Sequence, residues 1–172
     1  MRRILAMLAL TIGALVLVPV ASAGAATVSG QCTIAGTASF SPGGLTATPQ
    51  TMSYNFGGNG TCTGTLNGVP IISAPVSANA TGSGTLSCVA AVSTGGSGTL
   101  SFPNQGVSVG FHIDLVGAGS EVALSITGNS GGNGTGRASF GSNAARVAEC
   151  NSPTGLNNLG FDVQAGAVNL AG

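Results

Sequence analysis

The residues that could carry chemistry are few, and the most suggestive of them lie close together in the sequence. His112 and Asp114 are two positions apart, and Ser125 follows in the next alternating segment. Residues two apart on a strand point the same way, about 6.5–7 Å from each other. If Val116 pairs with Glu121 across a turn, Ser125 lies opposite His112. A Ser, a His and an Asp on one face are typical of a catalytic triad or of a surface metal site.

The surroundings of these residues argue against both readings. A triad needs a carboxylate behind the imidazole and an oxyanion hole at a sharp turn, and a flat hairpin supplies neither. No Gly-x-Ser-x-Gly elbow occurs. Asp114 and Glu121 share the hairpin face, but offset carboxylates are common on solvated sheets. We therefore predict no catalytic, cofactor-binding or metal-binding residues and no enzymatic activity, with a hydrolase using His112 as the enzymatic alternative.

Period-two alternation of apolar and polar residues dominates the chain and predicts β-strands with one buried face. In the clearest stretch, residues 107–127, the turn is expected at residues 117–120. The expected inward residues there are Val107, Val109, Phe111, Ile113, Leu115, Val122, Leu124 and Ile126. Elsewhere the inward sets are Cys32, Ile34, Gly36, Ala38 and Phe40; Met52, Tyr54 and Phe56; Cys62, Gly64 and Leu66; Leu86, Cys88, Ala90 and Val92; and Leu159, Phe161, Val163 and Ala165.

Glycine-rich segments separate these stretches and predict turns. Asn67-Gly68 suits a two-residue hairpin turn, and loop tips are expected at 42–44, 57–60, 94–96 and 131–134. Residues 142–149 are helix formers behind a Ser, which predicts a short helix. The expected fold is all-β: an antiparallel, immunoglobulin-like β-sandwich or a flattened barrel of about eight or nine strands.

The first residues resemble an export signal. Met1-Arg2-Arg3 precedes an apolar run, and Ala21-Ser22-Ala23 supplies small residues for cleavage after Ala23 or, as second choice, after Ala25. An uncleaved membrane anchor is the alternative, but the run is short for a bilayer span. We expect a signal peptide over 1–25, a single secreted β-sandwich domain over 26–172 and no transmembrane segment after cleavage.

Four cysteines follow the leader: Cys32, Cys62, Cys88 and Cys150. An even count after an export signal predicts two disulfides, for which three connectivities exist, and we favour Cys32–Cys62 with Cys88–Cys150. A zinc site is the competing reading, but the spacing contains no Cys-x-x-Cys pair. The location is therefore expected to be extracellular, either free or at the cell surface.

Charge is scarce and restricts the partners. Charged residues are 5% of the chain, and after leader removal two arginines face four carboxylates. A nucleic-acid partner is excluded, because phosphate neutralisation needs basic side chains. The polar, weakly charged surface favours self-association or attachment to a cell wall or a protein, and the partner itself stays unknown.

Three segments together resemble a loose group of exported proteins from high-GC Gram-positive bacteria. They are Cys32 with Phe40-Ser41-Pro42, the stretch Tyr54-Asn55-Phe56-Gly57-Gly58-Asn59-Gly60-Thr61-Cys62, and the Ala-rich run from Ala144 to Cys150. The resemblance spans most of the chain after the leader. It implies export, disulfides and β architecture, and it implies no reaction.

Two non-catalytic functions follow from these observations. The first is a secreted or cell-surface structural or interaction module. The alternative is an extracellular β-barrel carrier of a small apolar ligand or lipid, because small inward residues such as Gly36, Ala38, Gly64 and Ala90 leave either a thin core or a cavity. A filled interior would favour the module, and a cavity lined by Phe and Leu would favour the carrier.

The secreted form provides a direct check on the leader and the disulfides. Its mass should correspond to a chain that starts at Gly24 or Ala26, and it should be four hydrogen atoms lighter than the same chain after reduction. Intact-mass spectrometry with and without reductant measures both quantities. Free thiols at all four cysteines would contradict the oxidised framework.

Overall fold

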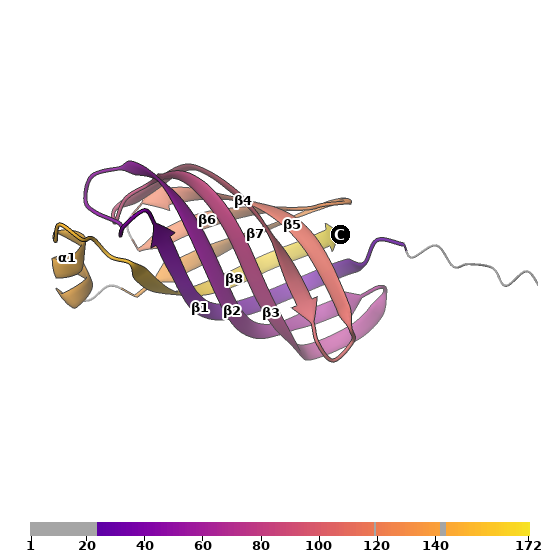
Figure 1. Ribbon diagram of the computed structural model, residues 1–172. Coiled ribbons are helices and arrows are strands. Elements are labelled where there is room, and N and C mark those ends of the chain that lie inside the picture. Colours follow the sequence, from indigo (N-terminus) through magenta and orange to yellow (C-terminus); the bar gives the residue numbers. More distant parts are fainter. Residues whose placement is uncertain (1–23, 119, 142–143) are drawn as a thin grey trace, which may run out of the picture.

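The computed structural model describes residues 24–118, 120–141 and 144–172, most of which lie in β-strands (Figure 1). The expected leader falls almost entirely outside the described residues. In chain order the elements are β1 (Thr27–Ser41), β2 (Gln50–Leu66), β3 (Val69–Leu86), β4 (Ala90–Phe102), β5 (Val107–Ala118), β6 (Glu121–Gly128), β7 (Gly131–Phe140), α1 (Ala144–Cys150) and β8 (Asn158–Ala171).

The strands form one closed barrel. Each pairs antiparallel with its neighbour along the chain, and β1 pairs with β8 to complete the ring. The all-β antiparallel prediction is confirmed, and of the two arrangements considered the molecule has the barrel. The β1–β2, β3–β4, β5–β6 and β7–β8 connections lie at one end, called here the α1 end because it carries α1 (Figure 1). The other three turns and the described C-terminus lie at the opposite end.

Alternating side chains explain why these segments form strands. In β1 every second residue is buried or half-buried, as Cys32 and Ala38 are, whereas Thr33 and Thr37 between them are exposed. The predicted inward sets of β1, β2, β5, β6 and β8 all face the interior. The inner surface is therefore apolar, and the outer surface consists largely of Ser, Thr, Asn and Ala, as an antiparallel sheet over a core requires.

The β5–β6 hairpin has the predicted faces but a different register. Ala118 pairs with Glu121, and Asp114 pairs with Ser125, so that Thr127 and not Ser125 lies opposite His112. The expected four-residue turn was wrong, because β5 continues through Ala118 and leaves only residues 119 and 120 to connect the strands. A shift of two residues preserves the faces, since side chains alternate with a period of two.

Several glycine tracts that were predicted as loop tips lie inside strands. Residues 57–60 are in the middle of β2, 94–96 are in β4 and 131–134 are in β7. In β2 the neighbouring strand approaches closely: a side-chain carbon on Gly60 would stand 1.8 Å from the Thr33 carbonyl oxygen. Space therefore requires glycine at Gly60, whereas Gly131 and Gly132, directly after the β6–β7 turn, have positive φ values of 116° and 78°. By contrast, Asn67-Gly68 does form a turn, with φ values of 51° and 78°.

The predicted strand over 86–92 is also interrupted. β3 ends at Leu86 and β4 begins at Ala90, and a turn lies between them. The Ser87 amide donates to the Ala90 carbonyl at 2.9 Å, and the Ser87 hydroxyl accepts from the Ala90 amide at 3.0 Å. A Ser side chain that replaces ladder hydrogen bonds in this way favours a turn over a continuous strand.

Both favoured disulfides are present. Cys32–Cys62 joins cross-strand partners of β1 and β2, and Cys88–Cys150 joins the β3–β4 turn to the last residue of α1. The helix prediction over 142–149 is confirmed by α1, although residues 142 and 143 are not described. The second disulfide therefore holds α1 at its end of the barrel.

The core consists of two clusters of buried residues. Phe102 and Val109, beside the β4–β5 turn, are 0% exposed. The main cluster extends from them through Phe111 and Ile113. A second, smaller cluster around Met52, Leu86 and Val122 lies toward the α1 end. The larger cluster thus includes the end of the barrel that is farthest from α1.

Phe111→Asp should prevent folding, because it places a carboxylate on the buried face of β5, with an expected loss of at least about 4 kcal/mol. His112→Asp is the matched control, since it introduces the same charge one residue along on the exposed face. Circular dichroism followed through thermal unfolding separates the two variants. A cooperatively folding Phe111→Asp variant would show that the hairpin faces have been assigned the wrong way round.

Candidate functional site

The residues that suggested catalysis lie on the outer wall of the barrel. His112, Asp114 and Ser125 are all exposed. Asp114 faces Ser125 across the ladder, and His112 does not, so the order needed for a triad is not formed. Within the described residues no group of three or more His, Cys, Asp or Glu side chains could hold a metal ion.

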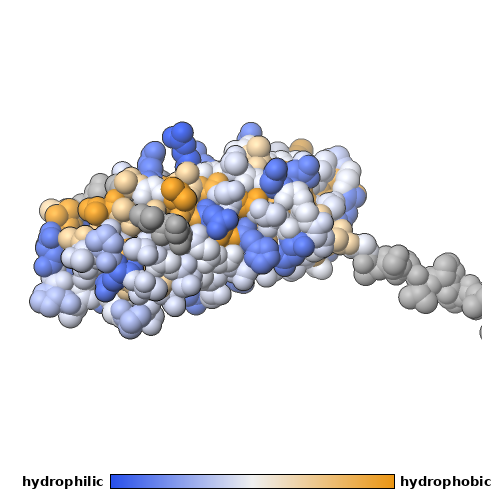
Figure 2. Space-filling view, turned by 90° about the horizontal axis from the view of Figure 1, so that it is seen from above, coloured by the Kyte–Doolittle hydropathy of each residue, from blue (hydrophilic) through white to orange (hydrophobic). Residues whose placement is uncertain are grey.

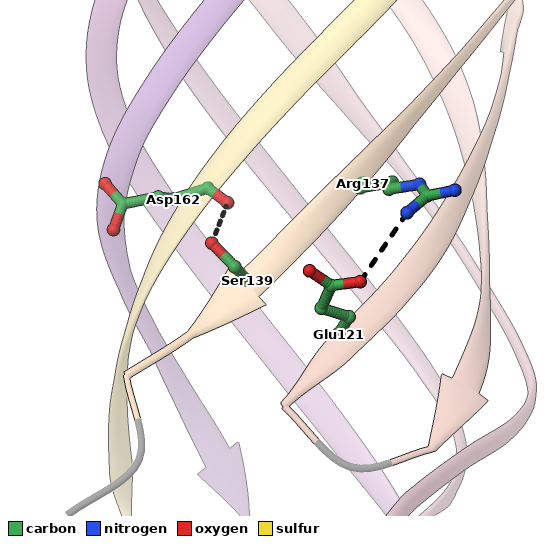
Figure 3. A network of polar contacts seen from close by, with 4 residues as sticks. All are labelled: Glu121, Arg137, Ser139 and Asp162. Atoms are coloured by element: carbon green, nitrogen blue, oxygen red, sulfur yellow. Dashed lines mark hydrogen bonds and ion pairs between the residues drawn. The ribbon is translucent and has the colours of Figure 1, made fainter.

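Other charged residues on the outer wall make weak surface contacts (Figure 3). Arg137 of β7 lies 3.6 Å from the Glu121 carboxylate of β6, with side chains 79% and 64% exposed. The Ser139 hydroxyl donates to the Asp162 carbonyl at 3.4 Å. Exposed ion pairs of this kind contribute about 0–1 kcal/mol. Glu121 is therefore one half of a surface ion pair, and it is not an acid–base partner of Asp114.

The strongest candidate site is a cavity of about 440 Å³ inside the barrel. All eight strands and α1 contribute to its lining, and nearly all the side chains are apolar. Phe56 and Phe161 meet edge to face in the wall, with ring centres 5.5 Å apart. A concave, apolar space of this size is typical of a binding site for a small molecule.

The cavity exists because small residues occupy inward positions where larger ones would fill the barrel. Ala38, Ala78, Ala138 and Ala165 each line it from a different strand. An eight-stranded barrel has an interior that side chains just fill or that holds one small ligand. Alanines at these four inward positions leave the second outcome.

The mouth of the cavity lies at the α1 end, among segments that are tied to one another. Leu45 of the β1–β2 connection exchanges backbone hydrogen bonds with Leu156 at 2.9 and 2.8 Å. The Cys88 amide donates to the Thr46 carbonyl at 2.9 Å, and Cys88 is bonded to Cys150. Two connections and α1 thus frame the mouth as one linked unit.

Apolar side chains remain exposed around this mouth. Val89 of the β3–β4 turn and Val147 of α1 are 55% and 59% exposed, and both line the cavity. Figure 2 shows the most extensive hydrophobic surface toward the end of the molecule that carries α1 in Figure 1. The entrance therefore has the same chemical character as the interior.

Tyr54 is the polar exception in the cavity wall. It is 4% exposed, and its hydroxyl has no hydrogen-bond partner. A side-chain carbon on Gly82 would stand 2.4 Å from this oxygen, and one on Gly96 would stand 2.5 Å away, so the phenol lies over two residues without side chains. The neighbouring Thr94 hydroxyl already donates to the Leu115 carbonyl and accepts from the Leu115 amide.

The environment of Tyr54 keeps its hydroxyl neutral. Burial raises its pKa from 10.0 to about 12, the negative charge of Asp114 adds to the rise, and Thr94 partly opposes it. Loss of the phenolic proton would place a charge in an apolar interior, which is costly. At all ordinary pH values Tyr54 therefore contributes a neutral aromatic ring to the cavity wall, together with one hydroxyl dipole that is not satisfied.

The comparisons with known proteins indicate no function, so the function is inferred from the geometry of the cavity. No protein-family model matches the chain, and neither a curated protein nor a solved structure matches it. The resemblance to exported Gram-positive proteins stays a prediction. Among the described residues there is no helix with the length and apolar character needed to cross a membrane.

Sequence reasoning found part of this site. It flagged small inward residues, including Ala38, as a source of a thin core or a cavity. It did not single out the frame of the mouth or the position of Tyr54, because both depend on contacts between segments far apart in the chain. The usable signal was the run of small residues at inward positions of several predicted strands.

Tyr54 is the single tyrosine in a chain with no Trp and no Lys, so its absorbance during alkaline titration reports on the cavity wall alone. The tyrosinate absorbance should rise with a midpoint near pH 12 in the folded protein and near pH 10 after unfolding. Because the folded state holds this proton more tightly, the free energy of unfolding should be unaffected below pH 10 and fall as pH rises from 10 toward 12.

Tyr54→Phe is the control for this titration. It removes a buried hydroxyl without a partner, a group whose burial costs about 1–3 kcal/mol, so the variant should be at least as stable as the parent. Its alkaline loss of stability should also be smaller. A folded-state midpoint near pH 10, or a clearly destabilised Tyr54→Phe, would show that the hydroxyl has water or a protein partner.

Proposed function

We propose that the protein is a secreted, non-catalytic carrier that holds a small apolar ligand or lipid inside its barrel. The observation that carries the proposal is the apolar cavity of about 440 Å³ with a mouth framed by α1. A structural or interaction module needs only a filled core, and empty apolar space reduces stability by about 24 cal/mol per Å³. A cost of that kind is explained if a ligand occupies the space.

Secretion is part of the proposal and has separate support. Two disulfides form in oxidising compartments and are rare in the cytosol, and the N-terminal residues have the pattern of an export signal. An apolar ligand outside the cell needs shelter from water. A barrel with a polar outer wall and an apolar interior provides that shelter.

The exposed position of His112, Asp114 and Ser125 makes a hydrolase a weaker proposal. None of the three lines the cavity, so a bound apolar molecule would not reach them. The outer wall, rich in Ser and Thr, is equally suited to a structural module. Occupancy of the cavity is therefore the property that separates the two non-catalytic functions.

The test is binding of a neutral, environment-sensitive dye such as Nile red to the oxidised protein. One dye per chain should bind, with a large rise in fluorescence as it leaves water. Ala138→Phe should reduce binding at least about tenfold, because it fills the cavity from β7, whereas Ser139→Phe adds the same ring to the outer wall and should leave binding unchanged.

Circular dichroism must show that both variants remain folded. If Ala138→Phe does not fold, Ala165→Leu fills the same space from β8 with a smaller side chain. Equal dye binding by the parent and a folded cavity-filled variant would contradict the carrier. The same conclusion would follow if the parent bound no dye and delivered no extractable apolar compound.

A further inference from the structure

One stretch of the barrel wall has a neighbouring strand on one side only. Residues 69–76, the first part of β3, pair with β2, whereas pairing with β4 begins at Ser77, opposite Ser101. It is the longest one-sided stretch among the described strands. An unpaired strand edge is a template for a strand from another molecule. Residues 69–76, called here the open edge, are therefore where such a strand is most able to add.

The side chains of the open edge would favour such an addition. Four of its eight residues, Val69, Ile71, Ile72 and Val76, are apolar and β-branched, and none is charged. Val69 and Ile72 are 63% and 84% exposed. Uncharged, β-branched segments are typical of strand addition and of cross-β assembly. Charged side chains, a common protection for an edge strand, are absent from residues 69–76, so a different protection is needed.

Pro70 stands where the backbone nitrogen faces the open side. Asn67-Gly68 is a two-residue turn with positive φ at both positions, and the residues that flank such a turn, here Leu66 and Val69, form a hydrogen-bonded pair. Hydrogen-bonded and non-hydrogen-bonded pairs alternate along an antiparallel ladder. Pro70, which lies opposite Thr65, therefore directs its nitrogen and its carbonyl away from β2.

Pro75 has the same orientation, as the paired part of β3 shows. A side-chain carbon on Gly98 of β4 would meet the Asn79 carbonyl oxygen, so this carbonyl points to β4. The Thr81 carbonyl has the same relation to Gly96. Backbone groups reverse direction at each residue of a strand, and the pairing with β2 is regular from 75 to 81. Pro75 therefore directs its nitrogen to the side of β4, which is open at this point.

Between the two prolines the open edge offers a single donor. Ile71 and Ala74 pair with β2. The Ser73 amide donates to the Thr63 hydroxyl of β2 at 3.0 Å, and Ser73 has a φ of 48° where the register of this ladder shifts. The Ile72 amide is thus the one N–H that remains for an added strand. A bulge at this position also increases the local twist, which makes the edge a poorer template.

We infer that Pro70 and Pro75 prevent the barrel from pairing through its open edge with a second copy of itself. Proline has no N–H, so the carbonyls of an incoming strand would find no donor at either position. A second copy is the partner to consider, because identical uncharged edges can pair antiparallel about a two-fold axis. The other described prolines lie in connections between strands, so the two prolines within strands are both on the open edge. The inference is independent of the carrier function.

The test replaces both prolines in the oxidised protein. Pro70→Thr with Pro75→Thr restores two outward N–H groups without adding charge, and Thr suits an exposed strand position. The parent should be monomeric, and the double variant should dimerise at least about tenfold more tightly than the parent. Size-exclusion chromatography with light scattering over a concentration series measures both. Each single substitution restores one donor and should give an intermediate affinity.

Pro103→Thr with Pro153→Thr is the matched control, because both prolines are exposed and lie in turns. This variant should remain as monomeric as the parent. Hydrogen exchange locates the contact in the variant that dimerises. The backbone amides at positions 70, 72 and 75 should become protected as the protein concentration rises, whereas those of β6 on the closed wall should not change.

Circular dichroism must show that the variants remain folded. If the double variant does not fold, the single variants carry the test. Association of either one, with protection of its restored amide, supports the inference. The inference is overturned if the folded variants stay monomeric at all concentrations, or if the parent already dimerises with its Ile72 amide protected. Equal association by the Pro103 and Pro153 variant would also overturn it, because loss of any exposed proline would then have the same effect.

Discussion

The ladder between β1 and β8 is the constraint on which the rest of the structure depends. It runs from Thr27 with Ala171 to Ser39 with Asn158, and so joins strands from the two ends of the described chain. The barrel has an interior only because this ladder closes it. An open sheet of the same strands would have two faces and would enclose no space. Contacts of such long sequence separation form late and slowly. The cavity and its mouth therefore both depend on this pairing of the two ends of the described chain.

Closure also explains why the proposed carrier function depends on the size of side chains more than on their reactivity. The circumference is set by eight strands, and the residues that point inward decide how much space remains. Inward alanines such as Ala138 and Ala165 leave a cavity, whereas Phe102 and Val109 are fully buried at the end opposite α1. The cavity extends toward that end as well, because Leu100 and Leu170 also line it. The reactive side chains remain outside on the wall.

The sequence predicted the faces of the strands well and their connections less well. Alternation places Phe111 inside and His112 outside whatever the register, so the all-β class and the inward sets followed directly. Glycines misled, because residues 57–60 have the composition of a turn, whereas Gly58 and Gly60 lie where β1 approaches too closely for a side chain. A sandwich and a barrel share the same alternation, so closure could not be read from the pattern. The unsatisfied Tyr54 hydroxyl depends on Gly82 and Gly96 from two other strands, and no local signal reveals it.

The parts of the mouth are joined covalently as well as by packing. Cys88–Cys150 ties α1 to the β3–β4 turn, and the Leu45–Leu156 bridge ties the two longest connections. An entrance built from loops alone would vary in width. Here α1 is anchored at its C-terminal residue, Cys150, which holds the helix beside the mouth.

Ring closure has one further consequence for a protein with so few charges. Proteins usually rely on like-charge repulsion, or on charged residues along border strands, to prevent sheets of different molecules from joining. Here each strand has a partner on both sides over most of its length, and residues 69–76 of β3, which pair with β2 alone, keep a free edge. Over the rest of the barrel wall the backbone donors and acceptors are already used within the ring. Along that wall, topology and not charge therefore limits the addition of a foreign strand.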